Sequence, residues 1–228
     1  MREPTVASLM TAEVIGAGPD TPFQDLVRLL GDNKVSALPV VEADRPVGVV
    51  SEADLLPKEE FRAGAEEPPG FFAARAEKHR WAQSAGLTAR DVMSTPVWTT
   101  TPDTPASRAA RELATAGVRR LFVVDGEGVL VGVLSRRDLL RLFVREDADL
   151  RREIQDEVFG RTLWVDPLTI GVTVSRGVVT LSGRLERRSE IEIAEHLVRS
   201  MPGVVEVHNN LRPDWDDSKR PRQTEIFG

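Results

Sequence analysis

Two stretches of the chain repeat one succession of hydrophobic and polar positions, and each predicts the element order β-α-β-β-α. In the first stretch, Phe23, Leu26, Val27 and Leu30 fall at helical spacing and predict a helix with one face in a core. Two short runs rich in β-branched residues follow, and the polar cluster between them predicts a turn that joins two strands. The same succession then returns further along the chain.

The end of each copy is the part that is most alike. Val47–Leu56 aligns with Val131–Leu140, and in both segments Gly precedes a Ser that opens a helical pattern with Asp three residues later. The offset is 83 residues in the preceding helix and 84 at Ser51 and Ser135, so one residue is gained in the turn before the last strand. An internal repeat of this kind indicates a duplicated structural unit.

Local signals predict where the helices of the two copies begin and end. We expect Thr21 to cap the first helix with Pro22 at its first position, and Thr104 and Pro105 to take the same places in the second copy. Pro57 is expected to end the short helix that begins after Ser51.

Residues 57–88 separate the two copies, and the stretch 71–84 predicts a helix within them. Two interpretations of this helix stay open. The basic run Lys78–Arg80 would act as a lid or phosphate contact, or the helix would be a solvated connector anchored by Phe72 and Trp81.

The pattern changes after residue 147 and predicts a third unit with the order α-β-β-α-β. Apolar residues recur every four positions from Leu150, and two alternating runs flank the turn Ser175–Gly177. Ser189 and Glu192 have the spacing of a capping box and predict the start of the second helix. The polar residues from 216 to the end are expected to fray.

Composition narrows the class of protein. The chain has 228 residues, a net charge of −6 and no cysteine. The acidic balance argues against nucleic-acid binding, and the missing thiols exclude disulfides and cysteine-ligated metals. No apolar run approaches the length that spans a bilayer. We therefore expect a cytoplasmic protein, either free or peripheral at the inner membrane.

The repeat resembles a tandem pair of CBS domains, also called a Bateman module, over residues 5–56 and 89–145. Gly48–Asp54 and Gly132–Asp138 carry the resemblance, and a Met before the first strand of each copy also suits the family. The resemblance implies an α+β fold in which two pseudo-symmetric repeats pack as one module and form a homodimer through their helices. The expected boundaries are residues 1–56 for the first repeat, 57–88 for the insert and 89–146 for the second repeat.

The third unit, residues 147–214, resembles a BON domain, a small α/β module found in osmotic-shock and envelope-related proteins, and we expect the whole protein to be of bacterial type. Val174–Gly183 and Gly203–Leu211 carry this resemblance, and residues 215–228 form a polar tail. The resemblance implies binding to phospholipid or to a protein partner. The arginines that would meet anionic head groups are Arg184, Arg187, Arg188 and Arg199, and a solvated helix face is the equal alternative.

The Ser-x-x-Asp segments are the candidate chemistry of the repeats. A helix N-terminus offers unpaired N–H groups to phosphate, Ser adds a hydroxyl donor, and an Asp one turn later can accept hydrogen bonds from ribose hydroxyls. In the CBS family these residues have those roles, and apolar residues around the first two strands hold the base. The corresponding residues here are Val14, Ile15 and Leu38 for one site and Val97, Trp98 and Leu121 for the other. The candidate nucleotide-binding residues are Ser135, Asp138, Arg136, Arg120, Val97, Trp98, Leu121, Ser51, Asp54, Val14, Ile15 and Leu38.

Ser followed by an acid three residues later also describes an ordinary helix cap without a ligand, and this alternative stays open. The two copies differ in charge. The second has several arginines in or near its motif, whereas the first has Glu52 at the position of Arg136, with Lys34 nearby. We therefore expect the second site to hold the more highly charged ligand and the first to be weak or empty.

These patterns favour a non-catalytic sensor. Its ligand would be an adenine nucleotide (AMP, ADP, ATP or S-adenosylmethionine), with no covalent cofactor and no metal. The alternative is a ligand-free scaffold that uses the CBS pair only to dimerise. An enzyme is not expected, because no nucleophile is paired with a base and His196 and His208 form no recognisable site.

Overall fold

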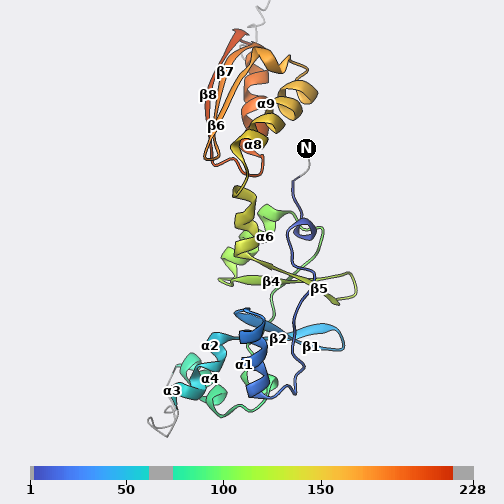
Figure 1. Ribbon diagram of the computed structural model, residues 1–228, viewed down its shortest axis with the longest axis vertical. Helices are drawn as coiled ribbons and strands as arrows, with labels where there is room; N and C mark the ends of the chain where they lie inside the picture. The colour runs from blue at the N-terminus through green and yellow to red at the C-terminus, as the bar shows by residue number, and fades with distance from the viewer. Residues whose placement is uncertain (1–2, 62–73, 218–228) are drawn as a thin grey trace, which may run out of the picture. The chain divides into compact units, whose positions relative to one another are not determined.

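The computed structural model of the chain describes residues 3–61 and 74–217 (Figure 1). The chain divides into two compact units. The N-terminal unit is formed by Thr5–Leu139 and holds both repeats; the C-terminal unit is formed by the residues from Leu140 onward together with those before Thr5. Each unit has its own hydrophobic core, so each is described by itself.

The first repeat has the elements η1 (Val6–Ser8), α1 (Phe23–Asp32), β1 (Ala37–Glu42), β2 (Arg45–Ser51) and α2 (Glu52–Leu55). β1 and β2 form an antiparallel hairpin. In place of the first strand that the pattern predicted, Ala17 alone makes a parallel bridge to Val40. Leu26 and Leu30 of α1 are buried as predicted, but Val27 is 48% exposed because the buried stripe runs along the other side of the helix.

The second repeat reproduces this arrangement. Its elements are α5 (Ala89–Val92), β3 (Thr99–Thr100), α6 (Ala106–Thr115), β4 (Arg120–Val124), β5 (Leu130–Ser135) and α7 (Arg136–Leu140). β3 is parallel to β4, and β4 is antiparallel to β5. Both hairpins shift register at equivalent places, between Val40 and Val41 and between Val123 and Val124. The duplicated α+β fold is therefore confirmed.

The two repeats exchange their opening segments. Thr11 pairs with Val133 on β5 of the other repeat, through N···O distances of 3.0 and 2.9 Å. Ser94 pairs in the same way with Val49 on β2, at 2.8 and 3.1 Å. Gly48 and Gly132 directly precede the two paired strand residues. A Cβ at either glycine would collide with the methionine of the crossing segment, and at Gly132 it would lie 2.6 Å from Met10 Sδ. Close backbone approach thus explains why each motif begins with Gly.

The helix starts differ from the prediction by one residue. α1 and α6 begin after Pro22 and Pro105, which occupy the N-cap position, and neither helix has a side-chain cap. Pro57 does not simply end a helix; it is the first residue of α3 (Pro57–Glu60), because a missing N–H costs nothing there.

The described part of the insert contains α4 (Arg75–Ala85). Trp81 meets Phe61 edge to face with ring centroids 5.2 Å apart, and Arg80 forms an ion pair with Glu60. His79 and its neighbours in the basic run are exposed, which favours the solvated connector. Phe72 and the start of the predicted helix lie outside the described residues.

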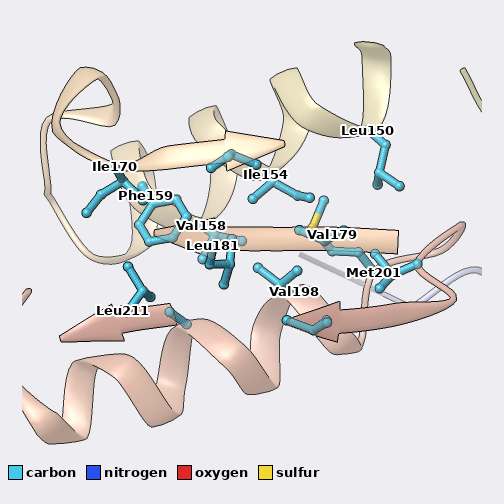
Figure 2. Packing of buried hydrophobic residues seen from close by; sticks show 14 of the residues in the cluster. Leu150, Ile154, Val158, Phe159, Ile170, Val179, Leu181, Val198, Met201 and Leu211 are labelled. Atoms are coloured by element: carbon cyan, nitrogen blue, oxygen red, sulfur yellow. The ribbon is translucent and has the colours of Figure 1, made fainter. Parts of the chain in front are cut away.

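The C-terminal unit has the predicted order α-β-β-α-β. Its elements are η3 (Arg141–Phe143), α8 (Asp147–Glu153), the π-helix η4 (Ile154–Thr162), η5 (Pro167–Thr169), β6 (Gly171–Ser175), β7 (Val178–Arg187), α9 (Arg188–Arg199) and β8 (Glu206–Trp215). β7 is the central strand, antiparallel to β6 and parallel to β8. Figure 2 shows Phe159 with Val179, Leu181 and Val198 filling the space between the helices and one face of this sheet.

Two hydrogen-bonding contacts between distant segments of this unit were not predicted. The carboxylate of Asp147, the first residue of α8, accepts hydrogen bonds from the N–H groups of Arg176 (2.7 Å) and Gly177 (3.0 Å) in the β6–β7 turn. Ser189 is not the N-cap of α9, which begins one residue earlier; its hydroxyl donates to Asp217 (2.6 Å). Hydrogen bonds from Ser189 thus fix Asp217 in place, although the residues from 216 onward were expected to fray.

Candidate functional site

The N-terminal unit contains a cavity of about 570 Å³, a volume in the range that small-molecule sites have. Both repeats line it, as do the five basic side chains Lys34, Arg119, Arg120, Arg136 and Arg137 and the two acidic side chains Glu13 and Asp138. We call it the Ser135 cavity. A cationic cavity in a chain of net charge −6 indicates a preference for an anionic ligand.

Ser135 and Asp138 lie together in its wall. Ser135 donates to Asp138 Oδ2 from its backbone nitrogen (2.8 Å) and from its Oγ (2.6 Å). The pair therefore forms the cap of α7, as the cap interpretation predicted, and also lines the cavity. α7 has only five residues, so its dipole is a minor source of attraction for phosphate and the arginines must supply most of it.

Arg120 is a strut between the repeats. Its guanidinium donates to the carbonyl oxygen of Ala37 (2.8 Å) and to Ser36 Oγ (2.7 Å) of the first repeat. Burial, with a smaller contribution from the neighbouring charge of Arg119, lowers the pKa of Arg120 below its usual value. The side chain stays charged at neutral pH. Its two hydrogen bonds to the first repeat hold the cavity wall in place.

The remaining cations are better placed to bind a ligand. Arg136 uses its Nε to donate to the carbonyl oxygen of Val118 (3.0 Å). Lys34, Arg119 and Arg137 line the cavity, and no carboxylate among the described residues forms an ion pair with them. Lys34 was expected near the first motif, and the structure places it here instead.

Apolar side chains form the other part of the wall. Val14 and Ile15 reach it because the segment that contains them crosses to β5 through Thr11 and Val133. Pro39 and Phe122 add to this wall from β1 and β4, the first strands of the two hairpins. The arrangement gives a flat base an apolar contact beside a charged region.

The first motif has the same cap but a different environment. Ser51 donates to Asp54 Oδ2 from its nitrogen (2.7 Å) and its Oγ (2.5 Å). Asp54 Oδ1 also accepts from Ser94 Oγ (2.7 Å) and from Gln83 Nε2 (3.1 Å). Neither Ser51 nor Asp54 lines the Ser135 cavity.

The other candidate residues do not line the Ser135 cavity, although Leu38 and Leu121 pair with Val50 and Leu134, the residues just before the two motif serines. Trp98 and Leu121 line a separate hollow of about 410 Å³ beside α6. Leu38 is fully buried in the core of the first repeat with Leu26. Val97 is half-buried and lines neither hollow.

Sequence reasoning missed the two residues that engage Asp54 from outside its helix. Ser94 had a signal, since it occupies the place of Thr11 in the duplicated pattern. Gln83 had none, because it is one polar residue in a polar helix and only the tertiary structure shows it to be 3% exposed.

The residues of the C-terminal unit that were considered as candidates do not line the Ser135 cavity or the hollow beside α6. Each of the four arginines considered for head-group binding lies near a carboxylate: Arg184 with Asp214, Arg187 with Glu186, Arg188 with Glu192 and Arg199 with Glu195. His196 and His208 are exposed and lie on different elements. Within residues 3–61 and 74–217 there is no cluster of three metal-ligating side chains. None of the helices described is long and apolar enough to cross a membrane.

Comparison with known proteins places these features in families. A CBS domain model matches residues 6–58 and 89–145, and a BON domain model matches residues 146–212. The uncharacterized protein MJ1426 of Methanocaldococcus jannaschii is 30% identical over 139 residues, which are 55% of this chain and 83% of that protein. The uncharacterized protein MK0525 of Methanopyrus kandleri is 26% identical over 143 residues, which are 62% of this chain and 64% of that protein.

Solved structures of CBS proteins are also similar. The crystal structure of CBSX2 in complex with AMP is 30% identical, with a TM-score of 0.48 over 60% of this chain and 93% of that one. The chain spans less than two thirds of some relatives, such as 35% of the uncharacterized protein MJ1404 of Methanocaldococcus jannaschii. These relatives are archaeal or plant proteins, whereas the sequence suggested a bacterial type.

Proposed function

Because the chain belongs to the CBS-domain proteins and carries a BON domain after its CBS pair, we propose that it is a regulatory protein that binds an adenine nucleotide in the Ser135 cavity. The observation that carries this proposal is the composition of the cavity wall. A carboxylate, a cluster of cations and an apolar surface meet there, and these are the three surfaces that ribose, phosphate and base need.

Each part of the ligand has a place in this proposal. Asp138 accepts hydrogen bonds from the ribose hydroxyls, and Val14 and Ile15 contact the base. Arg136, with the unpaired cations of the cavity, meets the phosphates, since guanidinium groups bind phosphate through paired hydrogen bonds. The excess of positive charge favours AMP, ADP or ATP over S-adenosylmethionine, whose sulfonium is itself a cation.

Thermal unfolding with each of the four ligands tests this function. A nucleotide at 100 times its dissociation constant adds about 2.7 kcal/mol to the free energy of unfolding. We expect Asp138→Ala to lose this gain and Asp54→Ala, the matched control, to keep it. A gain that survives in Asp138→Ala would place the ligand elsewhere.

A second function is a ligand-free scaffold, and the cap geometry favours it. In both motifs Ser and Asp bond to each other, so neither pair needs a ligand to be satisfied. This function predicts no change in unfolding with any of the four nucleotides. Both functions include a homodimer formed through the CBS helices, which light scattering after size-exclusion chromatography would detect.

We propose further that the BON domain carries the interaction with a partner protein or a phospholipid surface, with the protein cytoplasmic or peripheral at the inner membrane. Trp164 and Leu168 support an apolar contact, since they are 88% and 91% exposed. The pairing of the arginines with carboxylates makes purely electrostatic binding to lipid less favourable. Co-sedimentation with anionic and with zwitterionic vesicles separates the two cases. If the protein sediments with neither kind of vesicle, the partner is a protein.

A further inference from the structure

The carboxylate of Asp54 is fully engaged by the chain itself. Four donors reach it: the nitrogen and hydroxyl of Ser51, the hydroxyl of Ser94 and the side-chain amide of Gln83. An ionised carboxylate offers about four lone-pair sites. A ribose hydroxyl could therefore bond to Asp54 only by displacing one of these donors.

Gln83 is the donor that comes from outside both repeats. It lies on α4, in the segment that separates the repeats, and its side chain is 3% exposed. Its Nε2 donates to the carbonyl oxygen of Val92 (2.7 Å) as well as to Asp54 Oδ1 (3.1 Å). The amide thus bridges the first motif and the end of α5.

The rest of α4 is held in the same place. Trp81 packs edge to face on Phe61, and Arg80 pairs with Glu60 at the end of α3. These contacts lie within two turns of Gln83 and fix the helix against the elements that follow the first motif. The buried amide is therefore presented by an anchored helix.

We infer that α4 is an internal occupant of the first Ser-x-x-Asp site, in which the Gln83 amide takes the hydrogen-bonding position that ribose would take. Each chain then binds one nucleotide instead of two. This inference rests on the proposed function of the Ser135 cavity. It assigns the insert a purpose that its sequence did not reveal, which is to close one of two duplicated sites.

Entry of a ligand into the first site would break both hydrogen bonds of the Gln83 amide. Because a buried polar group that loses its partners is costly, we expect affinity at the first site to be at least about tenfold below that at the Ser135 cavity. Removal of the carboxamide should relieve this competition and restore a second binding event.

Isothermal titration of the full chain with ATP measures the stoichiometry. We expect about one ATP per chain for the wild type, and a second, weaker event in Gln83→Ala that disappears when Asp54→Ala is added. Gln24→Ala, which removes an exposed glutamine from α1, is the matched control and should keep one event. Gln83→Met, which keeps the length of the side chain and removes its carboxamide, serves as the variant if Gln83→Ala does not fold.

Each other result contradicts a separate claim. Two events in the wild type, one of them lost in Asp54→Ala, would overturn the occupancy of the first site and leave the proposed function intact. One event in a folded Gln83→Ala or Gln83→Met would show that the carboxamide does not close the site. Absence of binding in every variant would remove the proposed function itself.

Discussion

The first and second motifs are two copies of one local structure in two environments. In each, Ser donates twice to the Asp three residues later and begins a short helix. The second pair lines a cationic cavity, whereas the first is engaged by Gln83 and Ser94. The difference teaches that the motif sets the helix start, and that the residues packed around it decide whether a ligand can reach it.

The start of α5 is a third copy of the same local structure. Thr88 donates to Asp91 from its nitrogen and its hydroxyl, each at 2.9 Å, and the pair caps α5 on an exposed surface. This pair lines neither the Ser135 cavity nor the hollow beside α6. Three identical caps with three different surroundings show that Ser/Thr-x-x-Asp alone does not indicate a nucleotide site.

The largest change in the free energy of unfolding is expected at two leucines that the sequence suggested as contacts of the nucleotide base. Leu38 and Leu121 occupy equivalent positions, and both are almost completely buried in the cores of their repeats. Substitution of either by Ala should therefore lower the free energy of unfolding by about 2–5 kcal/mol, through lost burial and a cavity. Urea unfolding measures this loss. A normal stability combined with lost nucleotide binding would instead identify the residue as a ligand contact.

A smaller effect is expected from the cations that distinguish the two motifs. Arg119→Gln and Arg137→Gln should each weaken ATP binding about tenfold, near 1.4 kcal/mol, because each removes a charged hydrogen-bond donor from the cavity. Glu52→Arg gives the first motif the charge of the second and is the control. Calorimetric titration should show no new site in it, since Gln83 still engages Asp54. A new site created by Glu52→Arg would mean that charge, and not occupancy, separates the copies.

The smallest change in stability is expected at the Thr88–Asp91 pair that caps α5. Hydrogen bonds from the backbone N–H groups of Leu87 and Thr88, and from the Thr88 hydroxyl, hold the pKa of Asp91 below its ordinary value of 3.8. A depressed pKa in the folded state means that this carboxylate stabilises the fold above pH 3.8, and that the contribution is lost as the pH falls through the lowered value. Asp91→Asn should therefore differ from the wild type in urea unfolding at pH 6 and converge with it at low pH. A difference that persists at low pH would assign the effect to packing.

The sequence by itself determined the duplicated fold and the small C-terminal domain. Hydrophobic periodicity and turn residues are local signals, and they predicted the hairpins, the helices and the order of elements. The errors were local too: Pro22 and Pro105 occupy the N-cap positions expected of Thr21 and Thr104, and Arg187 occupies the one expected of Ser189. Such shifts of one or two residues arise because neighbouring residues compete for the same unpaired N–H groups.

Only the tertiary structure decided which residues share a site. The exchange of opening segments through Thr11 and Ser94 brings Val14 and Ile15 to the second motif, and no local pattern encodes that crossing. The same holds for Gln83, an ordinary polar residue until α4 packs against Asp54. Periodicity records which face of an element is buried, but it does not record which distant element buries it, and that contact is what separates the two motifs.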